Sequence, residues 1–147
     1  MKATLALGCF WYPEDVFRKT NGVVKTRVGY IGGKAKNPVY RNVCSGKTGH
    51  VEAVEITFNP NIISYNKILN IFWKLHDPTT KDRQGPDMGN QYNSAIFYHN
   101  QQQKEIAQKS KTELQKTIPK EIITKIRKAL KFWEAEVYHQ QYYNKQK

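Results

Sequence analysis

Apolar and polar residues alternate along three stretches of the chain, and this period of two is typical of half-buried β-strands. The stretches are residues 23–30, 49–59 and 92–98. A short, mostly apolar run over residues 4–7 predicts one further, buried strand. In the first of the alternating stretches, the predicted inward face carries Val24, Thr26, Val28 and Tyr30.

Other segments repeat their apolar residues every three or four positions, which indicates amphipathic helices. Residues 13–20 form a short predicted helix, and Ser64 is the expected N-cap of a longer one. The buried stripe of this longer helix is Ile68, Leu69, Phe72 and Trp73. Further helices are predicted over residues 101–116 and 134–143, whereas residues 122–132 fit a strand or a helix.

Two long segments, residues 34–47 and 79–91, have no period and are rich in Gly, Pro, Asn, Asp or Gln. They are predicted to be loops, and long ordered loops are often functional.

Several predicted strands follow one another without room for a helical crossover, so antiparallel pairing must contribute to the sheet. We therefore expect an α+β two-layer sandwich, with helices packed on a mixed, mainly antiparallel sheet, of the ferredoxin-like plait type. The 147 residues fit one domain, and no internal repeat or flexible linker divides them.

The charge of the chain is strongly basic, with 24 Lys and Arg against 12 Asp and Glu and a net charge of +12. This excess raises the alternative of a nucleic-acid-binding module without enzymatic activity. The basic residues are spread along the chain, however, and no known nucleic-acid-binding signature accompanies them. A solvated lysine-rich surface is the preferred interpretation.

The location in the cell follows from what the sequence lacks. No apolar run approaches the ~20 residues that span a bilayer, and the uncharged stretch after Lys2 is shorter than the core of an export signal. The two cysteines form no CxxC pair, so neither a disulfide scaffold nor a zinc ribbon is indicated. We expect a soluble, unexported cytoplasmic protein.

Cys9 lies where the first predicted strand passes into the first predicted helix. Free backbone N–H groups and the positive end of a helix dipole favour a thiolate at such a junction, so Cys9 is a candidate nucleophile. The alternative is a cysteine buried in the core.

Glu52 lies on the same face of its predicted strand as Val54, Ile56 and Phe58. Burial raises the pKa of a carboxyl group and makes it a usable general acid near neutral pH. The alternative is a side chain that escapes to solvent or pairs with a lysine.

The two predicted loops and the strands beside them add Tyr40, Asp87 and Tyr92 as polar candidates. With a thiol and an acid, these side chains favour a redox site over a hydrolase. A papain-like pair of Cys9 with one of the four histidines stays open. A metal site from Cys44, His50 and His76 is disfavoured, because no standard ligand spacing is present.

The motifs taken together resemble the type A peptide methionine sulfoxide reductases, and the resemblance covers nearly the whole chain. The matching segments are GCFW (8–11), GG (32–33), NPVY (37–40), VCSGKTGHVE (43–52), FW (72–73), HDPT (76–79), RQGPDMGNQY (83–92), EAE (134–136) and HQQY (139–142).

This resemblance implies an enzyme of residues 1–147 that reduces methionine-S-sulfoxide, free or in proteins, with no bound cofactor or metal. Cys9 attacks the sulfoxide sulfur and becomes a sulfenic acid. Glu52 supplies a proton, Tyr40 and Tyr92 hold the sulfoxide oxygen, and Asp87 organises the polar side. Phe10 and Trp11 enclose the methyl group on sulfur.

The same resemblance leaves the recycling of Cys9 open. Many relatives carry recycling cysteines in a Gly-rich C-terminal tail, whereas residues 144–147 contain none. Cys44 is either a resolving thiol or a buried packing residue. The expected partners are oxidised proteins and an external thiol reductant, thioredoxin or glutaredoxin, and the protein is expected to be a monomer.

Overall fold

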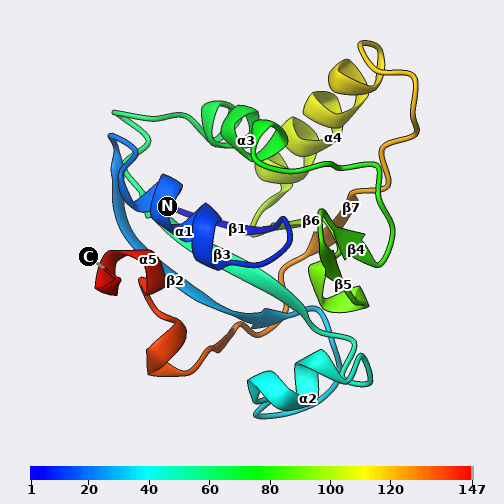
Figure 1. Cartoon of the computed structure of the whole chain (residues 1–147). Helices are drawn as coiled ribbons and strands as arrows, with labels where there is room; N and C mark the ends of the chain where they lie inside the picture. Colours follow the sequence, from blue (N-terminus) through cyan, green and yellow to red (C-terminus); the bar gives the residue numbers. More distant parts are fainter. Residues whose placement is uncertain (147) are drawn as a thin grey trace.

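The computed structural model describes residues 1–146 and contains a six-stranded sheet with its helices packed mainly on one face (Figure 1). The strand order is β7-β6-β1-β3-β2-β8. Neighbouring strands are antiparallel, except for the parallel pair of β6 and β7. The strands are β1 (Lys2–Ala6), β2 (Val23–Ile31), β3 (Val51–Phe58), β6 (Ala95–Tyr98), β7 (Lys125–Lys128) and β8 (Trp133–Glu134). The prediction of an α+β fold with a mixed, mainly antiparallel sheet is confirmed.

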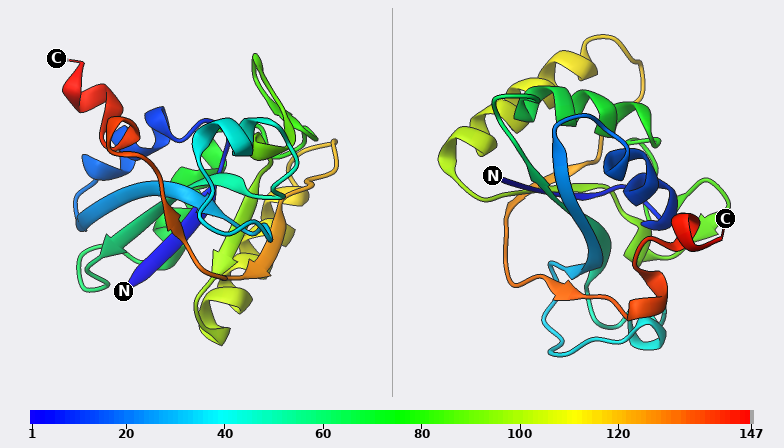
Figure 2. Two further views of the ribbon diagram at one scale, coloured as in Figure 1. Left: turned by 90° about the horizontal axis from the view of Figure 1, so that it is seen from below. Right: turned by 90° about the vertical axis from the view of Figure 1, so that its left-hand side faces the viewer.

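Three helices cover one face of the sheet: α1 (Trp11–Arg18), α3 (Tyr65–Lys74) and α4 (Gln101–Gln115). Helices α3 and α4 lie side by side in both Figure 1 and Figure 2, and the Trp73 indole N–H donates to Ser110 Oγ at 2.7 Å between them. Ser64 caps α3 as predicted, because its Oγ accepts the Lys67 N–H at 3.1 Å. The predicted stripe of α3 is buried in the main core.

The other face of the sheet carries a smaller apolar cluster of Ala6, Ile31, Ala53, Ala95 and Phe97. Partly buried side chains from the segment after β7, Ala129 and Phe132, pack against it. Strand β7 resolves the ambiguous segment over residues 122–132 in favour of a strand.

The predicted inward face of β2 is correct for Thr26, Val28 and Tyr30, which are buried, and wrong for Val24, which is 72% exposed. The pairing of β2 with β3 shifts register between Val23 and Lys25. An extra residue in one strand turns the side chains beyond it to the other face, so Val24 points to solvent.

The two predicted loops contain short elements that have too few residues to give a period. The first holds α2 (Tyr40–Cys44), and the second holds the hairpin of β4 (Arg83–Gln84) and β5 (Asp87–Met88), followed by the 3₁₀ turn η1 (Asn90–Tyr92). The prediction that both segments lack secondary structure is therefore wrong.

The predicted helix over residues 134–143 is also wrong. Its place is taken by β8, the 3₁₀ turn η2 (Val137–His139) and the short helix α5 (Tyr142–Lys145). The Gln140 side chain accepts the Val28 N–H at 2.9 Å and donates to the carbonyls of Val28 and Ala135. The two hydrogen bonds with Val28 tie this segment to β2, which local helix propensity does not anticipate.

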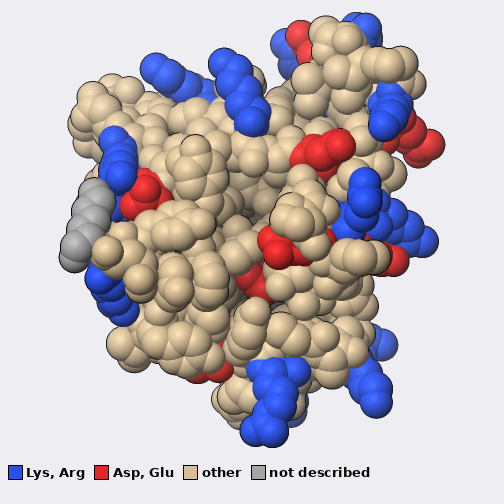
Figure 3. Space-filling model, viewed as in Figure 1, with Lys and Arg blue, Asp and Glu red and all other residues tan. Residues whose placement is uncertain are grey.

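The basic side chains do not gather into one patch on the face drawn in Figure 3, where they lie mostly around its periphery. This distribution agrees with the predicted solvated surface. Within residues 1–146, no helix is both long and apolar enough to cross a bilayer.

Candidate active site

Cys9 lies in the turn between β1 and α1, as predicted, and is partly exposed. The preceding Gly8 has a φ of +95°, and a Cβ there would lie 2.7 Å from the Gln84 side chain. Only glycine accepts both this backbone conformation and this close approach. The turn therefore brings Cys9 beside the β4–β5 hairpin, and the alternative of a fully buried core cysteine is wrong.

Burial raises the pKa of the Cys9 thiol to about 11, although a backbone hydrogen bond from Trp11 acts to lower it. The negative charges of Glu52 and Asp87 raise it further. The sequence-based expectation of a stabilised thiolate is therefore wrong for the free protein. A helix start lowers a thiol pKa only where burial and nearby carboxylates do not outweigh it.

Glu52 lies on β3 directly opposite Tyr30 of β2, and it is only 1% exposed. Burial raises its pKa to about 8, with a smaller contribution from Asp87 and an opposing hydrogen bond from the Phe10 N–H. That N–H donates to Glu52 Oε1 at 3.3 Å, whereas Oε2 is buried and has no hydrogen-bond partner in the protein. The prediction of a buried acid is confirmed, and the solvent-exposed alternative is wrong.

The phenols of Tyr40 and Tyr92 lie near each other, and Tyr92 lies near Glu52. Burial raises the pKa of Tyr40 above its usual value, and the neighbouring Cys44 and Tyr92 raise it further. Burial also raises the pKa of Tyr92 to about 12. The charge of Glu52 raises this pKa further, and Cys44 and Asp87 raise it to a smaller extent. The structure thus brings Cys9, Glu52, Tyr40, Asp87 and Tyr92 into one neighbourhood.

Cys44 is the last residue of α2, one helical turn after Tyr40, and its side chain is exposed. The alternative that Cys44 is a buried packing residue is therefore wrong. An exposed thiol near the phenols is accessible to a second sulfur.

The four histidines are engaged away from the Cys9 sulfur. His50 accepts the Gly33 N–H at 3.0 Å, His76 bonds to Ser94 at 2.7 Å and His99 bonds to Thr4 at 2.8 Å. His139 Nδ1 accepts the Trp11 indole N–H at 3.0 Å. Within the described residues, no group of three or more His, Cys, Asp or Glu side chains could hold a metal ion. Between residues 1 and 146, no hydrogen bond joins a histidine to the Cys9 sulfur, so the structure does not support the papain-like pair.

The aromatic residues next to Cys9 occupy different environments. Phe10 is 1% exposed and packs against Tyr30 and His139, with ring centroids 5.9 and 5.2 Å apart. Trp11 is partly exposed, and Tyr142 of α5 stacks on it at 3.8 Å. The C-terminal segment therefore supports Trp11 by one hydrogen bond and one ring stack.

Sequence reasoning missed Glu136, which fixes two tyrosines of the site. Its carboxylate accepts the Tyr30 hydroxyl at 2.9 Å through Oε1 and the Tyr40 N–H at 3.0 Å through Oε2. These hydrogen bonds contribute to holding the pKa of Glu136 below its usual value despite partial burial. Glu136 lies in the EAE motif (134–136), but the prediction of a helix over residues 134–143 indicated no contact for its side chain.

The fold and the site together are typical of a class of enzymes that place one partly exposed cysteine beside a buried carboxyl group. Comparison with known families narrows the class. The model of the family "Peptide methionine sulfoxide reductase" matches residues 1–147. The chain belongs to this family and is a methionine sulfoxide reductase, an enzyme that repairs oxidised methionine.

Individual relatives agree with this assignment. The protein named "Peptide methionine sulfoxide reductase MsrA" of Methanothermobacter thermautotrophicus is 53% identical over 146 residues, which cover 98% of this chain and 86% of that relative. The crystal structure of reduced Mxr1 from Saccharomyces cerevisiae has a TM-score of 0.94 at 36% identity, with 99% of this chain and 84% of that chain covered. Mxr1 in complex with Trx2 matches with a TM-score of 0.69 at 26% identity, over 97% and 84% of the two chains. Nothing in these comparisons supports a nucleic-acid-binding module.

Proposed function

We propose that Cys9 and Glu52 reduce methionine-S-sulfoxide together, by coupling attack on sulfur to protonation of oxygen. The observation that carries this proposal is the buried Glu52 carboxyl group, whose pKa is about 8 and whose Oε2 has no partner. Because Oε1 accepts the Phe10 N–H, the acidic proton belongs on Oε2. This oxygen is the donor for the substrate.

The atoms balance over two steps that yield a sulfenic acid. The Cys9 sulfur attacks the sulfoxide sulfur and forms a sulfur–sulfur bond, while Glu52 protonates the sulfoxide oxygen and the Cys9 thiol proton restores Glu52 to its acid form. The sulfur–sulfur bond and the bond from oxygen to the methionine sulfur then break as the hydroxyl group moves to the Cys9 sulfur. The products are methionine and Cys9 sulfenic acid.

The remaining site residues act by binding and orientation. The hydroxyls of Tyr40 and Tyr92 donate to the sulfoxide oxygen, where negative charge develops. Asp87 organises the polar side of the site. Trp11, with Phe10 beneath it, forms the apolar wall for the methyl group, so an apolar methyl substituent is favoured over a polar one.

The test of the chemistry uses two substitutions. Cys9→Ser should abolish sulfoxide reduction with dithiothreitol as the reductant, because oxygen does not transfer to a hydroxyl. Glu52→Gln keeps the shape of the side chain but removes its proton, and it should slow turnover by about 100-fold. Retained activity in Cys9→Ser overturns the proposal.

A second thiol must then convert the sulfenic acid into a disulfide and water. The candidates are the exposed Cys44 and an external dithiol of the thioredoxin or glutaredoxin type. The complex that the structural relative Mxr1 forms with Trx2 supports thioredoxin as the partner.

Mass spectrometry after one turnover without reductant distinguishes the two routes. A Cys9–Cys44 disulfide reduces the mass by two hydrogens, whereas a free sulfenic acid adds one oxygen and is trapped by dimedone. Cys44→Ser should yield only the sulfenic acid. If the protein without substitutions gives a dimedone adduct, the recycling of Cys9 is assigned to an external thiol.

Several broader expectations belong to the same proposal. Residues 1–147 act as a single type A catalytic domain and as a cytoplasmic monomer that needs no bound cofactor or metal and no nucleic acid. A ferredoxin-like plait is supported by the order β1-α1-β2-β3-α3-β6 along the chain and by the neighbours β6-β1-β3-β2 in the sheet.

A further inference from the structure

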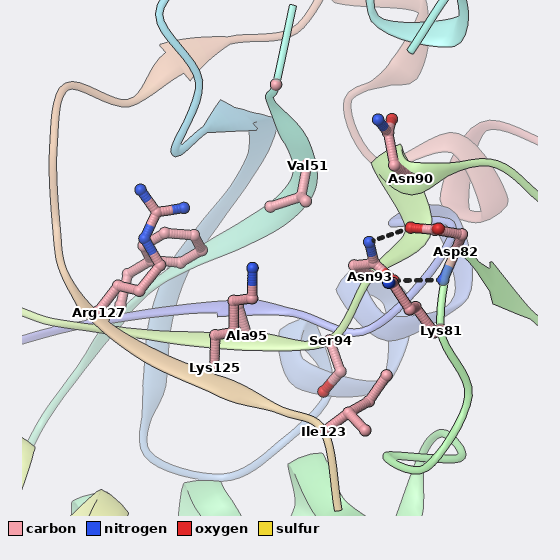
Figure 4. Close-up of a pocket in the computed structure, with 12 residues that line it drawn as sticks. Val51, Lys81, Asp82, Asn90, Asn93, Ser94, Ala95, Ile123, Lys125 and Arg127 are labelled. Carbon is pink, nitrogen blue, oxygen red and sulfur yellow. Dashed lines mark hydrogen bonds between the residues drawn. The ribbon is translucent and has the colours of Figure 1, made fainter.

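A pocket of about 370 Å³ opens on the face of the sheet that α1 and α3 leave uncovered (Figure 4). Its apolar wall is formed by the partly exposed Val51 of β3 and Ile123 before β7, with Ala95 and Phe97 of β6 buried behind them. Val51 adjoins Glu52 along β3, but successive side chains of a strand point to opposite faces. The pocket is therefore separate from the side of the sheet that carries the catalytic acid.

Three cationic side chains surround this apolar wall: Lys81 from the segment after α3, and Lys125 and Arg127 from β7. Lys125 and Arg127 are two residues apart on one strand, so they point to the same face. Within residues 1–146, none of the three forms a salt bridge. Arg127 donates to the Gly32 carbonyl at 3.2 Å and lies over the Phe97 ring, 5.8 Å from its centroid.

One carboxylate, that of Asp82, also lines the pocket. Its Oδ1 accepts the Asn93 amide at 2.8 Å, and the Asp82 N–H donates to Asn93 Oδ1 at 2.6 Å, as the dashed lines of Figure 4 mark. This mutual pair holds Asp82 against Asn93 and away from the lysines. The three cations exceed the one carboxylate, so the pocket carries a net positive charge.

We propose that this pocket binds a small organic anion with a carboxylate or phosphate group on an apolar body. The cations hold the anionic oxygens, and Arg127 is suited to a bidentate contact. The partly exposed Val51 and Ile123 receive the apolar body. A volume of about 370 Å³ lies at the lower end of the range for small-molecule sites.

The test is a titration of the ¹⁵N-labelled protein followed by amide chemical shifts, with phenyl phosphate as the probe. Saturable shifts are expected at residues 49–51, 93–97 and 125–127. Benzoate in a parallel titration distinguishes a carboxylate from a phosphate. Inorganic phosphate lacks the aromatic ring, and benzyl alcohol lacks the negative charge. Each should bind at least tenfold more weakly than phenyl phosphate.

Two variants and a matched control assign the binding to these side chains. Arg127→Met should weaken phenyl phosphate binding about tenfold, and Lys125→Gln should weaken it to a smaller extent. Lys128→Gln removes the same charge from the same strand, but its side chain lies outside the pocket. Lys128→Gln should bind as the unmodified protein does.

Sulfoxide reduction should be unchanged in Lys125→Gln, so failure of this site is distinguishable from failure of the proposed chemistry. The proposal is overturned if no shifts saturate, if inorganic phosphate binds as well as phenyl phosphate, or if Lys128→Gln weakens binding as much as Arg127→Met.

Discussion

The buried carboxyl group of Glu52 forms no salt bridge with any residue from 1 to 146, and burial raises its pKa to about 8. At neutral pH it is therefore mostly protonated and able to donate. The Cys9 thiol, whose pKa is about 11, is protonated too. The site thus holds two protons before substrate binds, and the thiol becomes a nucleophile only as its proton leaves.

This ionisation predicts the pH dependence of the chemical step. The single-turnover rate of methionine formation should fall as pH rises through about 8, because Glu52 loses its proton there. Rapid quenching between pH 6 and pH 10 measures this rate without interference from the reductant. Glu52→Gln should be slow and lack this transition, whereas the same midpoint in Glu52→Gln contradicts the assignment.

At the scale of elements, α2 is notable because it carries Tyr40 and Cys44 on only five residues. So short a helix is not stable by itself and needs tertiary contacts. Val43 supplies one by packing in the main core. Glu136 supplies another, since its carboxylate accepts the Tyr40 N–H at the first turn of α2 and also the Tyr30 hydroxyl.

Loss of this carboxylate should therefore displace Tyr40. Glu136→Ala is expected to lower kcat/KM for methionine sulfoxide about tenfold, because small displacements of positioning groups are costly. Glu136→Gln keeps one oxygen acceptor and should lose less. Steady-state kinetics with dithiothreitol measure both variants.

Glu134→Ala is the matched control, because Glu134 is exposed and its carboxylate pairs with Arg27 at 3.3 Å, not with a residue of the candidate site. Its kcat/KM should stay within twofold of the unmodified protein. Equal losses of kcat/KM in Glu134→Ala and Glu136→Ala would show that the loss does not come from displacement of Tyr40.

At the scale of the whole molecule, the last described residues pack against α1, the first helix of the chain. Figure 1 and Figure 2 show α5 beside α1, and Tyr142 stacks on Trp11 between them. The Gln141 N–H donates to the buried Glu14 at 2.7 Å. Gln140 anchors the same segment to β2 by two hydrogen bonds with Val28. The surroundings of Trp11 are therefore assembled from segments more than 120 residues apart in the chain.

Removal of the Gln140 anchor should lower global stability. Gln140→Ala removes the acceptor of the Val28 N–H and the side-chain donor to the Ala135 carbonyl, while the Val28 carbonyl still accepts the Ala135 N–H. The free energy of unfolding should therefore decrease by about 2 kcal/mol. Urea denaturation followed by tryptophan fluorescence measures this change. Gln146→Ala, an exposed residue of the same type, should change stability by less than about 0.5 kcal/mol. A Gln140→Ala variant as stable as Gln146→Ala contradicts the anchoring role.

The sequence by itself determined the features that depend on neighbouring residues. Alternation along β3 put Glu52 on the buried face, and the helical spacing of α3 identified its core stripe. The turn at Cys9 followed from the change of period between β1 and α1. Local backbone geometry determines which side chains share a face of a strand or helix, so this pattern can be recognised from the sequence alone.

Only the tertiary structure decided the features that depend on distant segments. The Cys9 pKa reflects burial and two carboxylates on other elements, so the local helix start predicted the wrong direction. Residues 134–143 adopt β8, η2 and α5 because Gln140 bonds to β2, more than 100 residues earlier in the chain. The same long-range packing brings Glu136 to Tyr40. Desolvation and long-range hydrogen bonds have no local period, and they decide which groups in this site are protonated and which are held in place.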